Sequence, residues 1–516
     1  LFMATTSASH IAVISMIAVR GSRRNIERGT MSIHSFWPAS RLAAAIQKGE
    51  LSAVDALEGC IERIEHFDGA LNAVCVRLFD EARDRARAAD EAQARGDCWG
   101  PLHGVPVTVK EAYDVAGTPT TWGLAERANH IAETDSEAVR GLRAAGAVIL
   151  GKTNVATNLQ DWQSNNALYG RTNNPWNLAR TPGGSSGGSA VSMAVGYAYL
   201  EAGSDIGGSL RNPAHFCGIC AHKPTFGIVP DTGHRIGDPE QPIDLLVCGP
   251  MSRSAEDLEL GLKAMAAPEP RDAPGWRLEL PPARHQRLED FRIAVITEEP
   301  VCRVSETVKD AIERMADACA KAGAAVDRNA ALPFDSRAAH RVYLGLLRGA
   351  LSTALSDAEF EEELQLATSL GADDESYRAL VARAFVQRHR AWLADDTERL
   401  AIRRAWSSFF ESYDVLLCPI APTPAWAHDP RDRFDRVIDV DGTGISYFDQ
   451  IFWSGVPILS YLPATTIPAG RSDEGLPVGV QIVAEYLEDR TALNAARLIE
   501  AETEGFVPPP AFASVD

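Results

Sequence analysis

The chain has 516 residues, of which 45% are hydrophobic and 23% charged, and its formal net charge is -20. This composition is typical of a globular protein with a substantial core. The negative charge argues against a nucleic-acid partner, because phosphates require a basic face. The nine cysteines are irregularly spaced, which fits a reducing compartment better than a disulfide framework.

The first 30 residues differ in character from the rest of the chain. Their apolar run, 11–19, is too short to span a bilayer, and Arg20, Arg23 and Arg24 follow it, whereas a secretory signal carries its basic residues in front. A transit peptide is an alternative interpretation. We interpret 1–30 as a poorly ordered extension from an upstream start, with the natural protein beginning at Met31, and expect a cytoplasmic enzyme without a membrane span.

Helical and strand patterns alternate from Ser52 onward. Ser52 can cap a helix whose apolar positions recur with helical spacing at Leu57, Cys60, Ile61 and Ile64. In chain order the patterns then predict a helix over about 80–95, a strand over 102–110, a helix over 136–145, a strand over 147–150, a strand over 291–296, a helix over 305–322, helices from about 337 to 410, and strands over 414–419, 456–461 and 478–483.

This succession predicts an α/β fold with a central mixed β-sheet flanked by helices on both faces. Residues 267–282 are rich in proline and charge, which is typical of a linker crossing the surface. We therefore expect a single domain over 31–516, in which the linker and a mostly helical insertion lobe occupy about 267–411.

Two serine clusters flanked by glycine carry the chemistry. The first is GGSSGGS at 183–189 and the second is DIGGS at 205–209, and an apolar segment of about a helix's length joins them. Glycine beside serine lets the backbone adopt positive φ and present N–H groups next to a hydroxyl. A nucleophile beside amide donors is what acyl transfer requires.

A serine nucleophile needs a base, and lysine is the candidate. No Ser-His-Asp arrangement stands out, and lysines are scarce. Lys110 ends the apolar run 104–109, which predicts a buried strand, and burial of an ammonium lowers its pKa toward neutrality. Lys152, just past the next predicted strand, is an alternative base on position alone.

Three stretches resemble the amidase signature family of serine hydrolases: GVPVTVKE at 104–111, TPGGSSGGSA at 181–190, and GSDIGGSLRNPAHFCGICAHKPTFG at 203–227. The resemblance runs from about residue 40 to 483 and is closer to the fatty-acid-amide-hydrolase-like branch of bacterial amidases than to the glutamyl-tRNA amidotransferase A subunit. It implies the amidase signature fold and a Ser-cisSer-Lys triad, with Ser209 as nucleophile, Ser185 as bridging serine after a cis Gly184–Ser185 bond, and Lys110 as base.

The same resemblance implies an oxyanion hole and an acyl pocket. The N–H groups of Ile206, Gly207, Gly208 and Ser209 would form the first, and Leu159, Gln160 and Trp162 would line the second. A surface loop with one anchored aromatic is the alternative for 158–169. We also expect Arg211 to pair with Asp205 and brace the turn between them.

The implied activity is hydrolysis of a small-molecule carboxylic amide through a seryl acyl-enzyme, without metal or organic cofactor and with a homodimer as one possible assembly. Four alternatives stay open. They are an amidotransferase-type subunit that needs partner chains, an esterase or carbamate hydrolase on the same triad, an α/β-hydrolase whose G-x-S-x-G elbow makes Ser185 the nucleophile, and a catalytically silent binding protein.

Two further groups have a packing interpretation beside a functional one. Cys217 and Cys220 form a lone CxxC without a second pair at ligand spacing, so we interpret them as packing and not as a zinc site. An aromatic group could form a wall of the pocket, although we favour core packing for it; its members are Tyr447, Phe448, Phe452 and Trp453.

Overall fold

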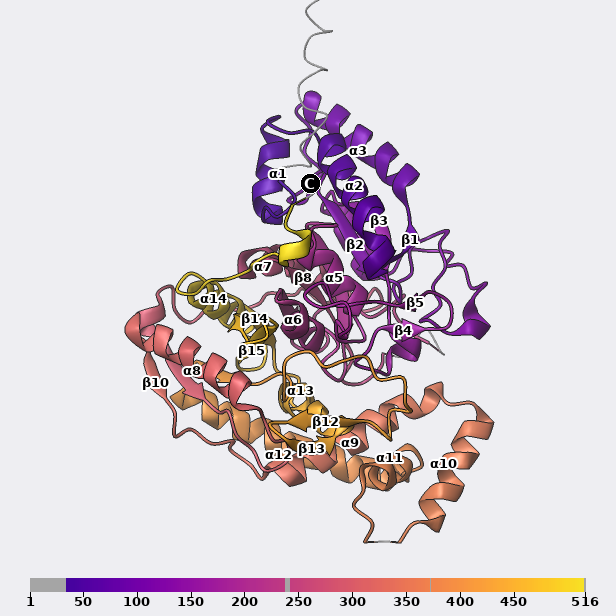
Figure 1. Ribbon diagram of the computed structural model, residues 1–516, viewed down its shortest axis with the longest axis vertical. Coiled ribbons are helices and arrows are strands. Elements are labelled where there is room, and N and C mark those ends of the chain that lie inside the picture. The colour runs from indigo at the N-terminus through magenta and orange to yellow at the C-terminus, as the bar shows by residue number, and fades with distance from the viewer. Residues whose placement is uncertain (1–33, 237–241, 372, 515–516) are drawn as a thin grey trace, which may run out of the picture.

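The computed structural model describes residues 34–236, 242–371 and 373–514, so the predicted extension lies outside the described residues. Its centre is an 11-stranded mixed sheet with the strand order β1-β3-β2-β6-β8-β7-β14-β15-β11-β9-β10 (Figure 1). The strands are β1 (Val74–Arg77), β2 (Pro106–Lys110), β3 (Val148–Thr153), β6 (Leu200–Asp205), β7 (Cys220–Lys223), β8 (Val247–Ser252), β9 (Arg292–Val295), β10 (Ala325–Asp327), β11 (Val415–Cys418), β14 (Ala464–Arg471) and β15 (Pro477–Val483).

Parallel pairing of β2 with β6 brings the two predicted chemical segments together. Val107 lies opposite Leu200 and Val109 opposite Ala202, so the carboxyl ends of both strands reach the same edge of the sheet. β2 ends at Lys110, and β6 runs into the second serine cluster. The pairing of these two buried strands therefore places Lys110 at the same edge of the sheet as the second serine cluster.

Helices pack against this sheet, either directly or on another helix. They are α1 (Ala39–Gln47), α2 (Ala53–Leu71), α3 (Phe79–Ala94), α4 (Glu137–Ala144), α5 (Gly187–Ala194), α6 (Arg211–Cys217), α7 (Ala255–Met265), α8 (Glu306–Lys321), α13 (Ile451–Leu459) and α14 (Asp489–Glu500). Of these, α1 and α4 pack on α7. The predicted cap is confirmed, since the Ser52 side chain accepts a hydrogen bond from the Asp55 N–H at 2.9 Å. All eight residues of α5 are buried, so the first serine cluster leads directly into the core.

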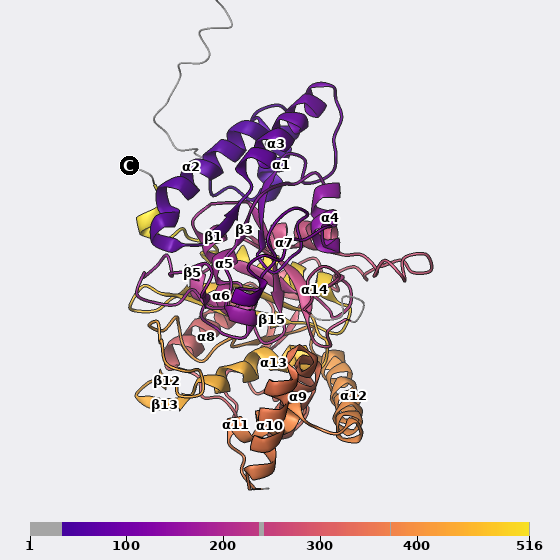
Figure 2. The ribbon, with the colours of Figure 1, turned by 90° about the vertical axis from the view of Figure 1, so that its right-hand side faces the viewer.

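A second group of helices gathers at the end of the molecule opposite α1–α3, as both views show (Figures 1 and 2). Its members are α9 (Ser336–Leu351), α10 (Asp357–Ser369), α11 (Tyr377–Phe385) and α12 (His389–Ser412). α9 packs against α11, α12 and α13. It thus connects this group to α13, while α12 also contacts the rest of the chain through the pair of Arg399 with Asp244.

The remaining elements are short. They are the two-stranded sheets of β4 (Asn165–Asn166) with β5 (Gly170–Arg171) and of β12 (Val437–Val440) with β13 (Thr443–Ser446), and the 3-10 helices η1 (Ala125–Arg127), η2 (Thr157–Leu159), η3 (Leu288–Asp290), η4 (Ser352–Ala354), η5 (Tyr447–Gln450) and η6 (Pro510–Phe512).

One predicted strand is wrong. The run 456–461 is not extended, because Ile451–Leu459 form α13, with all nine residues buried and Pro457 inside the helix. A continuous apolar run does not distinguish a buried helix from a buried strand. The strand predicted over 102–110 is also shorter than expected, since only Pro106–Lys110 pair with their neighbours.

Two helical glycines give opposite predictions for stability. A Cβ at Gly141 in α4 would lie 2.2 Å from the Ala264 carbonyl oxygen, whereas a Cβ at Gly69 in α2 would meet nothing within 4 Å. We expect Gly141→Ala to lower the free energy of unfolding by about 1–3 kcal/mol, because α4 and α7 must separate. Gly69→Ala should raise it by about 0.5–1 kcal/mol through helix propensity. Urea unfolding measures both, and equal effects of the two substitutions would contradict the packing argument.

Candidate active site

Lys110 contacts the first serine cluster at the carboxyl edge of the sheet. Its Nζ donates to Ser185 Oγ at 2.7 Å and to Ser204 Oγ at 3.0 Å, and its side chain is fully buried. Burial lowers the pKa of Lys110 to about 7, although Asp205, Cys248 and Glu201 act in the opposite direction. The amine is therefore available in its neutral form near physiological pH.

Ser185 lies in the loop that precedes α5, and the expected cis geometry of the Gly184–Ser185 bond is confirmed. Ser209 lies in the turn between β6 and α6. Both serines line one cavity together with Leu159, Ile206 and other residues. No direct hydrogen bond joins their two hydroxyls; the backbones are linked instead, through the Ser186 N–H and the Ser209 carbonyl at 3.3 Å.

A buried ion pair braces the turn that carries Ser209, as expected. Arg211 Nε and Nη2 each lie 3.0 Å from an Asp205 carboxylate oxygen, and neither side chain is exposed. Asp205 also accepts the Gly208 N–H at 2.7 Å and the Leu210 N–H at 3.1 Å. Burial alone would raise the pKa of Asp205, but Arg211 and the Gly208 N–H outweigh it and hold the pKa below its usual value.

The turn's carbonyl groups are held by two aromatic side chains. Tyr343 Oη in α9 donates to the Ile206 carbonyl at 2.8 Å, and Trp162 Nε1 donates to the Gly207 carbonyl at 3.0 Å. A side chain at Gly208 would be strained, since φ is 98° and a Cβ would lie 2.4 Å from Ser454 Oγ. The turn is therefore fixed on both sides.

The N–H groups of this turn fall into two kinds. The Gly208 N–H donates to Asp205. The N–H groups of Ile206, Gly207 and Ser209 donate to no acceptor in the part of the chain that the structure describes. Three of the four predicted oxyanion-hole donors are thus unengaged within the turn.

The alternative base occupies a different environment. Lys152 is also fully buried, but its Nζ donates to Thr118, Pro119 and Thr120 and to neither serine cluster. Burial lowers the pKa of Lys152 to about 8. The basic side chain that contacts Ser185 is therefore Lys110, and not Lys152 or a histidine.

The cavity at Ser209 includes all three residues predicted for the acyl pocket, Leu159, Gln160 and Trp162. Of the predicted aromatic group, Phe448 lines this cavity, whereas Tyr447, Phe452 and Trp453 are buried and absent from its lining. α9 adds three lining residues that the sequence analysis missed: Leu347, Arg348 and Leu351. α9 carries no motif, so only its spacing as an amphipathic helix could have drawn attention to them.

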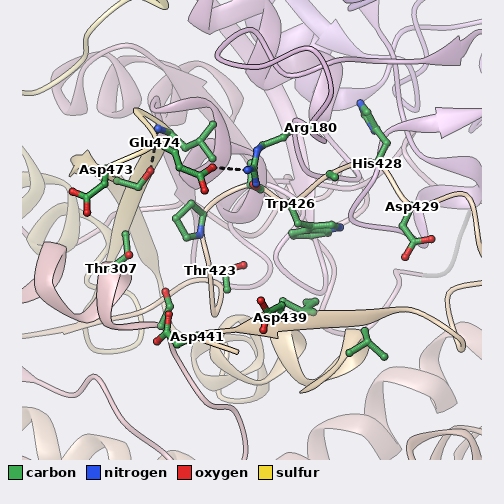
Figure 3. A pocket seen from close by; sticks show the side chains of 18 of the residues that line it. Arg180, Thr307, Thr423, Trp426, His428, Asp429, Asp439, Asp441, Asp473 and Glu474 are labelled. Carbon is green, nitrogen blue, oxygen red and sulfur yellow. Dashed lines mark hydrogen bonds and ion pairs between the residues drawn. The ribbon is translucent and has the colours of Figure 1, made fainter. Parts of the chain in front are cut away.

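A larger cleft lies elsewhere. It has a volume of about 730 Å³ and contains none of the residues of the predicted triad. Figure 3 shows its carboxylates, Asp429, Asp439, Asp441, Asp473 and Glu474, of which Glu474 pairs with Arg180. It offers neither a nucleophile beside a base nor a turn of unengaged N–H groups, so the candidate active site is the smaller cavity at Ser209.

Other features bear on the remaining predictions. Cys217 and Cys220 are both buried and unpaired, consistent with packing. The described residues contain no cluster of three or more side chains suited to holding a metal ion. No helix in the described ranges combines the length and apolar character that crossing a membrane requires.

Comparison with known proteins identifies the family. The Amidase family profile matches residues 55–493. Indoleacetamide hydrolase of Bradyrhizobium diazoefficiens is 32% identical over 473 residues, covering 90% of this chain and 86% of that protein. The glutamyl-tRNA(Gln) amidotransferase A subunit of Moorella thermoacetica is 32% identical over 491 residues, covering 90% of this chain and 96% of that protein.

Solved structures of amidases share the fold of this chain. The structure of 6-aminohexanoate cyclic dimer hydrolase complexed with substrate superposes with a TM-score of 0.75 at 25% identity, covering 93% of this chain and all of that one. A bacterial aryl acylamidase of the amidase signature family shares the fold, with a TM-score of 0.76 at 22% identity and coverage of 91% and 96%. The chain belongs to the amidase family, and the predicted fold class and family are confirmed. It is accordingly a hydrolase that acts on the C–N bond of amides.

The Asp205–Arg211 pair gives a prediction about stability. Arg211→Met leaves the Asp205 carboxylate buried without its partner, so we expect the free energy of unfolding to fall by about 3–5 kcal/mol. Arg431→Met is the control, because it removes the partner of Asp429 in a pair whose arginine is 56% exposed, and it should change stability little. Equal losses in the two variants under urea unfolding would contradict the bracing role.

Proposed function

We propose that this protein hydrolyses a carboxylic amide through a seryl acyl-enzyme, with Ser209 as nucleophile, Ser185 as bridging serine and Lys110 as base. The observation that carries the proposal is the 2.7 Å contact between the buried Lys110 amine and Ser185 Oγ, inside the cavity that Ser209 also lines. An alcohol needs a base within hydrogen-bond reach to become a nucleophile, and a neutral amine supplies it.

In the acylation step, Ser209 Oγ attacks the amide carbonyl carbon as its proton passes to Ser185 Oγ. The proton of Ser185 moves at the same time to Lys110 Nζ. Negative charge develops on the carbonyl oxygen, where the unengaged N–H groups of Ile206, Gly207 and Ser209 can receive it. The C–N bond then breaks, and the leaving amine takes the proton back along the same path.

In the deacylation step, a water molecule attacks the ester carbonyl and gives its proton to Ser185 and hence to Lys110. The acid is released and Ser209 regains its proton. Apart from the attacking water, every role in the cycle is filled by a side chain or a backbone group, so the proposal requires no cofactor.

The similarity to the amidotransferase chain favours a second candidate function, in which this protein works only with partner chains. Release of ammonia or amine from a simple aryl amide by the purified chain alone supports the first candidate. Hydrolysis that appears only after a partner is added supports the second.

Covalent trapping tests the nucleophile. We expect a fluorophosphonate to label Ser209, as mapped by peptide mass spectrometry, and expect Ser209→Ala to abolish both labelling and turnover. Ser185→Ala should slow labelling while leaving the site of attachment at Ser209, because the relay is lost but the nucleophile remains. Label on Ser185 would instead support an α/β-hydrolase in which Ser185 is the nucleophile. The absence of any label would support a catalytically silent binding protein.

The pH dependence tests the base. Because the reactive form of Lys110 is the neutral amine, kcat/KM for an uncharged amide should be constant above the pKa of about 7 and fall about tenfold per pH unit below it. Lys110→Arg stays protonated at every accessible pH and should lose activity throughout. A flat profile between pH 5 and 8 in the unaltered enzyme would contradict the role of Lys110.

A further inference from the structure

Arg348 is a buried arginine at the wall of the candidate active-site cavity, and its guanidinium lies 5.6 Å from the centre of the Phe385 ring. It lies in α9 and lines the same cavity as Ser209 and Trp162, and it is only 7% exposed. Its one hydrogen bond to a described residue runs from Nη2 to Tyr377 Oη at 2.8 Å. Its Nε is buried and has no partner among the described residues. A guanidinium has five N–H donors, so most of its capacity is unused.

No carboxylate in the described chain compensates this charge. Arg348 forms no ion pair there, whereas buried Arg211 pairs with Asp205 at 3.0 Å. The acidic residue that lines this cavity, Asp161, is already bound by Arg436 at 2.7 Å and by the Tyr447 hydroxyl. Leaving a buried cation without a counter-charge is costly, which indicates that the partner of Arg348 comes from outside the chain.

A second arginine adds to the excess of positive charge. Arg433 Nη1 donates to the Gln160 carbonyl at 2.9 Å and to Gln160 Oε1 at 3.3 Å, and it forms no ion pair with a described residue. Burial, followed by the nearby charge of Arg348, lowers the pKa of Arg433. Arg348 thus lines the cavity and Arg433 lies behind the lining residue Gln160, in a chain whose formal net charge is -20. The positive charge of these two arginines favours an anion in this part of the cavity.

We propose that Arg348 binds a carboxylate on the acyl part of the substrate, so that the enzyme selects monoamides of dicarboxylic acids over neutral amides of the same size. The planar guanidinium matches a carboxylate through paired N–H donors, and the apolar walls of Leu347, Leu351 and Ile451 suit the methylene chain between the two groups. The proposal rests on the proposed function, since it needs the scissile carbonyl at Ser209.

The test compares the monoamides of dicarboxylic acids with one to four methylene groups against neutral primary amides of matched length, with ammonia release as the readout. We expect at least one anionic amide to exceed its neutral match about tenfold or more in kcat/KM. Arg348→Met should reduce that value about 10- to 100-fold, the scale of a charge-assisted hydrogen bond, while leaving the neutral amide nearly unchanged. Arg348→Lys should keep part of the preference for the anionic amide, because lysine keeps the positive charge but lacks the paired N–H donors of the guanidinium.

Arg341→Met is the matched control, since Arg341 lies in the same helix but is 51% exposed and sits 3.7 Å from Glu375. It should leave both substrate classes unaffected. A wild-type enzyme without preference for any anionic amide, or an Arg348→Met variant that affects both classes equally while melting at the wild-type temperature, would overturn the proposal.

Binding separates this proposal from the proposed function. Calorimetry with butanedioic acid monoamide on Ser209→Ala, with and without Arg348→Met, needs no turnover. Binding that depends on Arg348 supports the subsite even if the wild-type chain hydrolyses no amide, in which case the proposed function alone fails. Binding that is equal in both variants overturns the subsite even if neutral amides are hydrolysed.

Discussion

The contact between the Lys110 amine and the Ser185 hydroxyl is the interaction on which the proposed mechanism depends, and the charges around it determine the protonation of the amine. Asp205 is already paired with Arg211. Burial raises the pKa of Glu201 to about 8, despite hydrogen bonds from Thr108 and Thr153, so this neighbour is largely uncharged at pH 7. A protonated Lys110 would therefore be buried without a free counter-charge, which favours the neutral amine and lowers the pKa of Lys110 to about 7.

The same pairing of buried charges holds the Ser209 turn. Asp205 accepts both a guanidinium and the N–H groups of Gly208 and Leu210, so one carboxylate fixes the turn and keeps the arginine buried. Trp162 and Tyr343 take the Gly207 and Ile206 carbonyls. With its carbonyls held by these bonds, the turn keeps a defined orientation of the peptide planes beside the serine.

The fold class, Lys110 and both serine clusters could be predicted because each has a local signal: an apolar strand ending in lysine, or serine set among glycines. The misassigned helix α13 had only apolar character, which lacks a period when every side is buried. Tyr343 lies 137 residues from its partner Ile206, and no pattern in the sequence predicts this contact. Arg348 reaches the cavity for the same reason, through the packing of α9 and not through a motif.

Both unpredicted residues, Tyr343 and Arg348, come from α9. Tyr343, Leu347 and Leu351 follow each other at i, i+4 and i+8, the spacing that places side chains on one side of a helix, and Arg348 lies next to Leu347 on the flank of that side. Tyr343 contacts the turn that carries Ser209, and the other three line the cavity beside it. Through α9, the lobe therefore contacts the Ser209 turn at Tyr343 and lines the cavity one helical turn later. Under the proposed mechanism, changes at Leu347, Arg348 or Leu351 would alter which amide fits while Tyr343 and the buried lysine network stay as they are. The selection of substrate would then be separate from the cleavage of the bond.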